Sequence, residues 1–226
     1  MSFLKDTLSI FKKSELVFIE KVKESQRVYS FLFKKDQDLT WKPGQHGLFT
    51  ITHKKIKNHT KPFTVSSIPS EGVVRLTTTI GENPSDFKQA LLELEPGMKI
   101  NMSGPVGSFY LKEKSPALFI AADIGITPFR AIIKQIEGEN IGKQVKLLYF
   151  DSENMHIYKV DFKNVDVDFI TTKEQLLQEI NIFKEKHKEK GQYFVAGSKD
   201  AVNMVVEHLK SSNIAKRAIK KDVFVG

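Results

Sequence analysis

A cation, an aromatic ring and a hydroxyl fall within four consecutive residues of this chain. Residues 61–67 read Lys-Pro-Phe-Thr-Val-Ser-Ser, in which Lys61, Phe63 and Thr64 carry the three groups. A cation suits a pyrophosphate, a ring suits the flat face of an isoalloxazine, and a hydroxyl donor suits the reactive nitrogen of that ring system. The segment therefore predicts a site for a flavin dinucleotide.

A second cluster lies in the other half of the chain, where Gly125-Ile126-Thr127-Pro128 follows an apolar run at residues 117–122. Thr127 is a good N-cap and Pro128 a good first helical residue, so the pattern predicts a strand, a glycine turn and a capped helix. The amides at the start of such a helix attract phosphate. The cluster therefore predicts a nicotinamide dinucleotide site in addition to the flavin site.

A third segment could receive one of the flavin phosphates. Ser85 can cap a helix that runs from Asp86 to about Leu94, and the preceding residues 81–85 read Gly-Glu-Asn-Pro-Ser. The first amides of that helix lie beside this segment and can bind phosphate. An ordinary capped helix without a ligand is the alternative, and the residues alone leave both interpretations open.

The elements expected around these clusters change character midway along the chain. In the first half, short runs rich in β-branched and aromatic residues are separated by turn signals, which predicts an antiparallel β-barrel. From residue 117 onward, apolar strands alternate with helices, which predicts a doubly wound parallel sheet that binds cofactors at the carboxyl ends of its strands. We expect two domains, a barrel over residues 1–112 and an α/β domain over residues 113–226. The expected strands are 16–19, 28–33, 47–52, 62–66, 73–80, 99–102, 117–122, 145–150, 167–171, 192–196 and 223–225, and the expected helices are 86–94, 128–136, 173–189 and 200–209.

Composition excludes several kinds of chemistry. The 226 residues are 40% hydrophobic and include no cysteine, so a cysteine-ligated iron–sulfur cluster, a thiolate nucleophile and a cysteine zinc site are excluded within this chain. The longest apolar run, residues 117–122, is far shorter than the roughly 20 residues that a membrane span requires. We expect a soluble, cytoplasmic protein with no transmembrane segment.

The net charge of +8 raises the question of nucleic acid. Most positive charges are lysines scattered over both halves and mixed with 27 acidic residues, which is typical of a solvated surface and not of a nucleic-acid interface. One denser cluster at residues 53–61 reads His-Lys-Lys-Ile-Lys-Asn-His-Thr-Lys. It could attract the phosphates of the cofactor or an acidic redox protein, or it could only keep a hairpin tip soluble.

The chain resembles the ferredoxin-NADP reductase superfamily, whose members join a flavin-binding β-barrel to a nicotinamide-binding α/β domain. The flavin motif of that family reads Arg-x-Tyr-Ser or Arg-x-Tyr-Thr, and Lys61, Phe63 and Thr64 stand at its named positions. Pro62-Phe63-Thr64 is also similar to the ferric reductase and NADPH oxidase branch. The other matches, in the family's order, are Trp41-Lys42-Pro43-Gly44-Gln45-His46, residues 81–85, Gly104-Pro105-Val106-Gly107-Ser108-Phe109 and Asp222-Val223-Phe224-Val225-Gly226.

The resemblance implies an NAD(P)H-dependent flavin oxidoreductase that passes electrons through FAD to an acceptor that the residues do not identify. Ferric chelates, a flavodoxin or ferredoxin, a quinone, oxygen and a membrane haem subunit are all compatible with it. Thr64 is the implied catalytic residue, because its hydroxyl would bond near the hydride-accepting nitrogen. The implied cofactor-binding residues are Lys61, Pro62, Phe63, Thr64, Val65, Ser66, Thr78, Gly81, Pro84, Ser85, Gly125, Thr127, Pro128, Asp151, Gly197 and Phe224.

Several positions depart from the family. Lys61 keeps the charge of the usual arginine but loses its bidentate fork, and Phe63 keeps the ring of the usual tyrosine but loses its hydroxyl. Asp123 stands where a pyrophosphate would be repelled unless the side chain points away. An alternative function is therefore a flavin-binding or regulatory module whose nicotinamide site is degenerate, although Gly125 and Gly197 keep the turns that the enzyme needs.

The choice of nicotinamide rests on residues 151–154, which read Asp-Ser-Glu-Asn after the second expected α/β strand. Relatives that use NADPH commonly place Ser and Arg there. Two carboxylates would repel the extra ribose phosphate, whereas Asp151 could accept hydrogen bonds from a free ribose hydroxyl. We therefore expect NADH to be preferred over NADPH, unless Lys159 or Lys199 folds back to meet the phosphate. The alternative is that Asp151 and Glu153 only solvate a loop.

Overall fold

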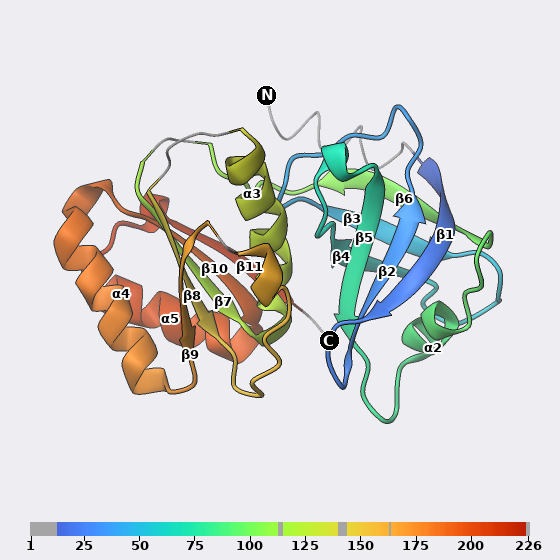
Figure 1. Cartoon of the computed structure of the whole chain (residues 1–226). Helices are drawn as coiled ribbons and strands as arrows, with labels where there is room; N and C mark the ends of the chain where they lie inside the picture. Colours follow the sequence, from blue (N-terminus) through green and yellow to red (C-terminus); the bar gives the residue numbers. More distant parts are fainter. Residues whose placement is uncertain (1–12, 113–114, 140–143, 163, 225–226) are drawn as a thin grey trace. The chain divides into compact units, whose positions relative to one another are not determined.

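The computed structural model describes residues 13–112, 115–139, 144–162 and 164–224 (Figure 1). The chain divides into two compact units, Met1–Tyr110 and Leu111–Gly226. Each unit has a sheet and a hydrophobic core of its own.

The first unit is an antiparallel six-stranded sheet in the order β4-β3-β6-β1-β2-β5. A bridge between Val65, just after β4, and Leu76 of β5 links the two edges, so the sheet closes on itself. The predicted antiparallel barrel is therefore confirmed. Its strands are β1 (Lys13–Lys23), β2 (Val28–Lys34), β3 (His46–Ile51), β4 (Thr60–Thr64), β5 (Val73–Thr79) and β6 (Lys99–Val106).

Alternating apolar side chains fill the interior of this barrel, as the period of two in a strand requires. The helix α2 (Asp86–Leu92) adds Phe87, Ala90 and Leu91 to the same core. Ser85 caps α2 as predicted, because its hydroxyl accepts a hydrogen bond from the backbone N–H of Lys88. The helix has only seven residues and ends two residues before the predicted end.

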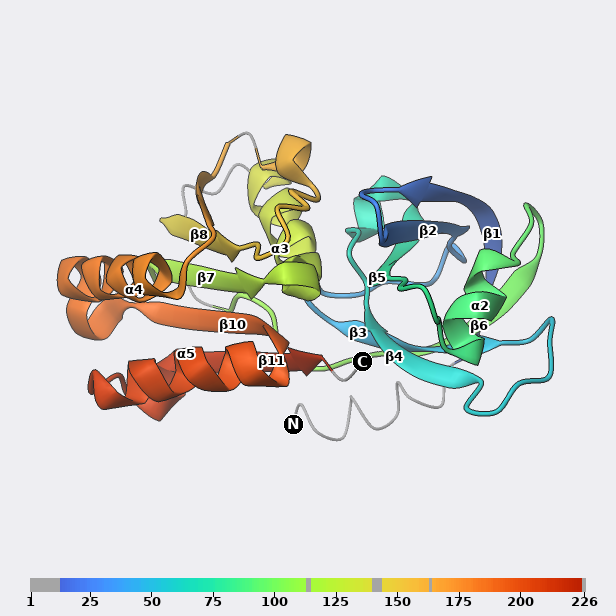
Figure 2. The ribbon, with the colours of Figure 1, turned by 90° about the horizontal axis from the view of Figure 1, so that it is seen from below.

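The second unit is a parallel five-stranded sheet in the order β11-β10-β7-β8-β9. Helices α4 and α5 pack on one face of it, and α3 lies on the other face (Figure 2). The predicted doubly wound parallel sheet is confirmed. Its strands are β7 (Ala117–Ala122), β8 (Val145–Phe150), β9 (Asp166–Ile170), β10 (Gln192–Ser198) and β11 (Ile219–Phe224), and its helices are α3 (Thr127–Gly138), α4 (Lys173–His187) and α5 (Lys199–Ser211).

The parallel register brings the predicted nicotinamide segments to one edge of the sheet. Ala121 of β7 lies beside Ala196 of β10, and Ala122 lies beside Phe150 of β8. The segments that follow β7, β8 and β10 therefore leave the sheet as neighbours at its carboxyl edge. Ligands bind at this edge in open α/β sheets.

Candidate functional site

The three groups of the Lys-Pro-Phe-Thr segment lie on β4 but do not share a face. In the β3–β4 pair, Lys61 stands opposite the fully buried Phe49, while Thr64 stands opposite His46. Alternation along the strand then places Lys61 and Phe63 on the interior side and Thr64 on the other side. A ligand that contacts all three groups must reach around the end of β4.

Phe63 is a member of the barrel core as well as a candidate ligand contact. Its ring stacks on Phe87 of α2 with 5.5 Å between ring centroids, and it meets Phe49 edge to face at 6.2 Å. The side chain remains partly exposed. The contact with α2 was not anticipated from the sequence, because it joins residues that are distant along the chain.

Lys88 is a second cation near Lys61 that sequence reasoning missed. Burial lowers the pKa of Lys88, and the charge of Lys61 lowers it further. In the described part of the chain, neither ammonium has a hydrogen-bond or ion-pair partner. A pair of half-buried lysines without a carboxylate is an environment that fits an anionic group such as a pyrophosphate.

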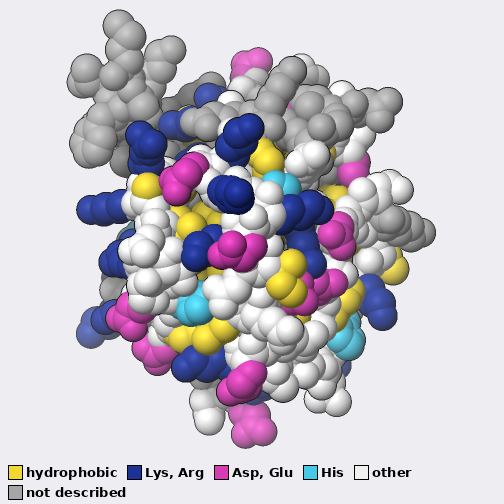
Figure 3. Space-filling model, turned by 90° about the vertical axis from the view of Figure 1, so that its left-hand side faces the viewer, with side chains coloured by type: hydrophobic (Ala, Val, Ile, Leu, Met, Phe, Trp, Pro, Cys, Tyr) yellow, Lys and Arg dark blue, Asp and Glu magenta, His cyan; other side chains and the backbone are white. Residues whose placement is uncertain are grey.

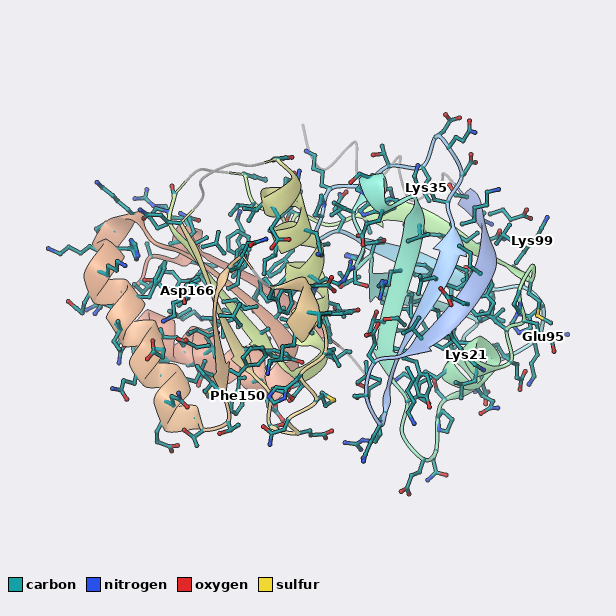
Figure 4. All side chains as sticks on the ribbon, viewed as in Figure 1. Lys21, Lys35, Glu95, Lys99, Phe150 and Asp166 are labelled. Atoms are coloured by element: carbon teal, nitrogen blue, oxygen red, sulfur yellow. The ribbon has the colours of Figure 1, made fainter. Side chains whose placement is uncertain are left out.

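Three other lysines of the barrel are held by contacts within the protein. Lys21 donates to the carbonyl oxygen of Leu92 at 2.9 Å, and Lys35 donates to that of Leu39 at 3.2 Å. Lys99 pairs with a carboxylate oxygen of Glu15 at 2.7 Å. These three lysines are labelled in Figure 4.

The residues that follow Phe63 differ in what their side chains can offer a ligand. Thr64 is buried, and its hydroxyl makes no hydrogen bond to any described residue. Val65 is fully buried in the core. Ser66 is also fully buried, and its hydroxyl donates to the carbonyl oxygen of Arg75 at 3.1 Å and contacts the Thr77 hydroxyl at 3.2 Å. Its role as a cofactor contact remains a prediction.

The remaining predicted flavin residues lie around α2 and the end of β5. Gly81 is exposed, with open space where a side chain would stand, and Pro84 is partly exposed beside the cap at Ser85. Thr78 is buried, and its hydroxyl makes only a long hydrogen bond of 3.4 Å to the Thr79 carbonyl. The role of these residues as cofactor contacts remains a prediction.

His46 lies on the same face of the sheet as Thr64. Its ring occupies the space next to Gly107, where a Cβ would come within 2.9 Å of the imidazole Nδ1. Burial lowers the pKa of His46, so the ring is neutral near pH 7. The His46 ring therefore has a packing role in the barrel.

In the second unit, Gly125 and Gly197 allow two backbones to approach closely. A Cβ on Gly125 would lie 2.5 Å from the carbonyl carbon of Ala196 and 2.7 Å from the Cα of Gly197. A Cβ on Gly197, where φ is +151°, would lie 2.8 Å from the Cβ of Ala122. The two glycines are therefore required by contact between the β7 turn and β10, whether or not a ligand approaches them.

The prediction that Thr127 is the N-cap of α3 is wrong. A 3₁₀ turn, Asp123–Ile126, runs directly into α3, so Ile126 already has helical dihedrals and occupies the cap position. Thr127 is buried at the first helical position, and no side chain caps this end. Pro128 follows at the second position and is also buried.

Asp123 is held by the loop after β8. Its Oδ1 accepts hydrogen bonds from the backbone N–H of Ser152 at 3.1 Å and from the Ser152 hydroxyl at 2.9 Å. Burial raises the pKa of Asp123, while these two bonds act in the opposite direction. The carboxylate is thus committed to an internal contact, which weakens the case for a degenerate nicotinamide site.

Asp151, the predicted contact of a ribose hydroxyl, lies inside the protein, and its role as a cofactor contact remains a prediction. The residue is 1% exposed, and its Oδ2 accepts a hydrogen bond from the backbone N–H of His156 at 2.6 Å. Its Oδ1 is buried with no described partner. Asp151 therefore stabilises the loop from inside, and Ser152, Glu153 and Asn154 are the exposed residues of this segment.

A buried ion pair holds the same loop onto α3. The Arg130 guanidinium donates to Asp161 at 2.9 Å, and Lys134 pairs with the other oxygen of that carboxylate at 3.1 Å. Arg130 is almost fully buried and lies 5.3 Å from the ring centroid of Tyr158. Sequence reasoning missed this clamp, which fixes the position of residues that follow the carboxyl end of β8.

The last strand carries Asp222, a carboxylic acid with a raised pKa. Burial raises the pKa of Asp222 to about 6, and this side chain has no hydrogen-bond or ion-pair partner in the described part of the chain. Phe224, a predicted cofactor contact, is partly exposed at the end of β11. Sequence reasoning noted the segment that contains Asp222 but did not single out the residue.

Within ranges 13–112, 115–139, 144–162 and 164–224, no group of three or more His, Asp or Glu side chains could hold a metal ion. Over the same ranges, none of the helices has the length and apolarity needed to cross a membrane.

Comparison with known proteins identifies the first unit. Residues 13–110 match the model of the oxidoreductase FAD-binding domain. The chain is 23% identical over 142 residues to a flavohemoprotein of Halalkalibacterium halodurans, which covers 58% of this chain and 34% of that protein. It is 25% identical over 146 residues to the toluate 1,2-dioxygenase electron transfer component of Pseudomonas putida, which covers 63% of this chain and 42% of that protein. The chain therefore spans less than half the length of these curated relatives.

Solved structures share the fold of nearly the whole chain. A ferredoxin-NADP+ reductase from Plasmodium falciparum superposes with a TM-score of 0.78 at 15% identity, over 93% of this chain and 95% of that chain. A flavohemoglobin from Malassezia yamatoensis superposes with a TM-score of 0.75 at 15% identity, over 94% of this chain and 60% of that chain. The barrel and the parallel sheet of this chain are thus the fold of these solved structures. The two-domain fold expected from the resemblance is therefore observed, while the family match itself covers residues 13–110.

Proposed function

We propose that this protein is an FAD-dependent oxidoreductase that takes electrons from NADH or NADPH and passes them to an external acceptor. The observation that carries the proposal is the lysine pair, Lys61 and Lys88, in a unit that matches an FAD-binding domain. Lys61 shares the interior face of β4 with Phe63, and Lys88 follows the residue on which the Phe63 ring stacks. Cations and an aromatic face are therefore adjacent, as a flavin dinucleotide requires.

The residues of the barrel have separate tasks in this proposal. Lys61 and Lys88 bind the pyrophosphate as two point charges, which offsets the missing arginine fork. Phe63 presents the part of its ring that α2 does not cover. Thr64 donates its unpartnered hydroxyl toward the reacting edge of the flavin. FAD, when held by these residues, would supply the chemistry of hydride acceptance and electron release.

The carboxyl edge of the parallel sheet is the proposed nicotinamide site. Gly125 and Gly197 keep the backbone there free of side chains, and the clamp between Arg130 and Asp161 holds the adjacent loop. The Asp123 carboxylate accepts a hydrogen bond from the Ser152 hydroxyl, so it does not face a ligand as an unpaired charge. These contacts favour the enzyme over a module with a degenerate site.

The proposed preference for NADH rests on Glu153 alone, whereas the sequence suggested two carboxylates. Asp151 is buried, so Glu153 is the carboxylate of this loop that is exposed to a dinucleotide. Its charge would disfavour the additional phosphate of NADPH. The appropriate variant is therefore Glu153→Arg, with Ser152→Arg as a second choice. Either should shift the ratio of kcat/KM values toward NADPH if the loop contacts the ribose.

The acceptor is proposed to be an acidic redox protein or a ferric chelate, and both are anionic. The hairpin between β3 and β4 presents the exposed lysines Lys55 and Lys57, whereas Lys54 pairs with Glu93 at 2.9 Å. Opposite charge accelerates encounter and makes the rate depend on salt. A panel of acceptors with NADH, each at two salt concentrations, should show the largest salt effect for the physiological class. The cytoplasmic location expected from the sequence is tested separately by cell fractionation.

The test of the proposed function is FAD binding followed by anaerobic titration with NADH. We expect fluorescence quenching of added FAD, and then loss of the visible flavin absorption as NADH is added. A protein that binds no FAD would contradict the whole proposal. A protein that binds FAD and stays oxidised with both nicotinamides would instead be a flavin-binding module.

A further inference from the structure

A cavity of about 720 Å³ lies at the amino edge of the parallel sheet, opposite the proposed nicotinamide site. It is bounded by the residues just before or at the starts of β7, β10 and β11. From Gln192 at this edge to Gly197 at the other, β10 extends about 17 Å, taking 3.3 Å per residue. The cavity is therefore separate from the site described above, and its volume suits a small molecule.

Three cations border this cavity against one carboxylate. Lys188, Lys190 and Arg217 line it together with Glu189. All four side chains are exposed, and across the described ranges the three cations form no ion pair. Figure 3 views this side of the molecule, where Lys and Arg side chains gather with acidic groups between them. The local charge balance at the cavity favours an anion.

A buried hydroxyl without a partner provides independent evidence of a ligand. Tyr193 lines the cavity and is fully buried, and its hydroxyl finds no hydrogen-bond partner among the described residues. Burial, with smaller contributions from Glu189 and Glu185, raises the pKa of Tyr193 to about 12, so the hydroxyl keeps its proton. A buried donor left unsatisfied is costly, and an acceptor atom of a ligand would remove that cost.

The local backbone brings these groups together. Lys188 adopts φ of +46° and ψ of −130°, a conformation that side chains rarely adopt, and its N–H caps the Lys184 carbonyl at the end of α4. That bond satisfies a helix-end carbonyl that would otherwise repel an anion. Gly191 then passes beside Tyr193, where a Cβ would lie 3.2 Å from the hydroxyl oxygen. The strained turn thus places Lys188 and Lys190 beside the cavity, whose wall includes the hydroxyl group of Tyr193.

We propose that this cavity is a second binding site, which takes a small organic anion with a phosphate or carboxylate group. Lys190 and Arg217 attract the anionic group, and Tyr193 donates a hydrogen bond to one of its oxygens. The site lies on the opposite edge of the sheet from the proposed nicotinamide site and does not depend on flavin chemistry.

The experiment is isothermal titration of the full chain saturated with FAD, using inorganic pyrophosphate and citrate as probes. We expect one equivalent of at least one probe to bind. The double variant Lys190→Gln/Arg217→Gln should weaken binding by about tenfold, because two charge-assisted contacts are lost. Tyr193→Phe, which keeps the ring packing against Phe183, should weaken it several-fold. The control Lys34→Gln/Lys173→Gln removes two exposed charges outside the cavity and should bind as the wild type does.

Three outcomes would overturn the proposal. The first is the absence of binding heat with both probes, and the second is an unchanged affinity in the Lys190/Arg217 double variant. The third is binding that occurs in the FAD-free chain and disappears when FAD is added, which would place the anion in the flavin site. Thermal unfolding with and without each probe gives a second measurement for any variant that is less stable. If the chain binds no FAD, the proposed function fails while the titration of the FAD-free chain still tests the cavity.

Discussion

Gly125 packs against the backbone of Ala196 and Gly197, which occupies the space where a side chain on Gly125 would stand. The Cα of Gly197 lies 2.7 Å from where a Cβ of Gly125 would stand. This contact joins the turn after β7 to the end of β10 at the carboxyl edge of the sheet. The shape of the proposed nicotinamide site therefore depends on a contact within the protein.

Gly125→Ala should destabilise the second unit. The added methyl group would clash with the backbone of Ala196, which cannot move without disturbing β10, so we expect a loss of about 2–3 kcal/mol in unfolding free energy. Gly138→Ala is the matched control, because a Cβ at this exposed helical position meets open space. The control should be neutral or gain about 0.5 kcal/mol. Equal unfolding midpoints in urea for Gly125→Ala and the wild type would contradict the contact.

Substitutions of Phe63 should separate its role in the core from its role in the site. Phe63→Ala removes the contacts with Phe87 and Phe49 and should cost about 2 kcal/mol of stability, while weakening FAD binding. Phe63→Leu keeps most of the volume, so it should cost less than about 1.5 kcal/mol of stability yet still weaken FAD binding. Chemical denaturation and FAD titration of both variants provide the comparison. If Phe63→Leu binds FAD as tightly as the wild type, the ring does not stack on the flavin.

Thr64 and Ser66 should respond differently to loss of the hydroxyl. Thr64→Val should retain FAD and slow flavin reduction by about tenfold, because one donor to the reacting edge is lost while shape is kept. Ser66→Ala should leave the rate unchanged and reduce stability by about 1 kcal/mol, because it breaks the buried bonds to Arg75 and Thr77. Stopped-flow reduction by NADH measures the first effect. A Thr64→Val protein reduced at the wild-type rate would remove Thr64 from the mechanism.

The raised pKa of Asp222 predicts that replacing this residue with asparagine stabilises the protein at high pH but not at low pH. Burial raises its pKa from 3.8 to about 6, so the folded state holds this proton more tightly than the unfolded state does. The contribution of protonated Asp222 to the free energy of unfolding is fully present below pH 3.8, and it is lost as the pH rises through about 6. Asp222→Asn should therefore match the wild type near pH 4 and exceed it by about 2 kcal/mol near pH 8.

Urea unfolding across this pH range checks the prediction. Asp166→Asn, on an exposed position of β9, controls for the loss of one surface carboxylate. A stability difference between Asp222→Asn and the wild type that does not change with pH would show that the carboxylate is not held in a desolvated position.

Periodicity predicted the fold well because it reports local geometry. The apolar run at Ala117–Ala122 and the alternating runs of the barrel became strands close to their expected bounds. The turn at Asp123–Ile126 was missed because Thr127-Pro128 satisfies the usual rule for a helix start, and only the three-dimensional path shows that helical dihedrals begin earlier. Local rules therefore located the elements and misplaced one boundary.

The site was harder to predict because its contacts join distant segments. A glycine required by a ligand and a glycine required by packing look the same in a sequence, as Gly125 and Gly197 demonstrate. Asp151 was expected to meet a ribose hydroxyl or to solvate a loop, yet its carboxylate is buried and accepts a hydrogen bond from a backbone N–H. Lys88 was missed because its proximity to Lys61 depends on how α2 packs against β4.

The central claim is that the barrel holds FAD in a state that a nicotinamide can reduce. The most direct measurement is anaerobic titration of the FAD-saturated protein with NADH, and separately with NADPH, while the visible flavin absorption is followed. We expect the absorption to be lost after about one equivalent of NADH, because one hydride carries the two electrons that FAD accepts. A flavin that binds but remains fully oxidised with excess of both nicotinamides would contradict the account.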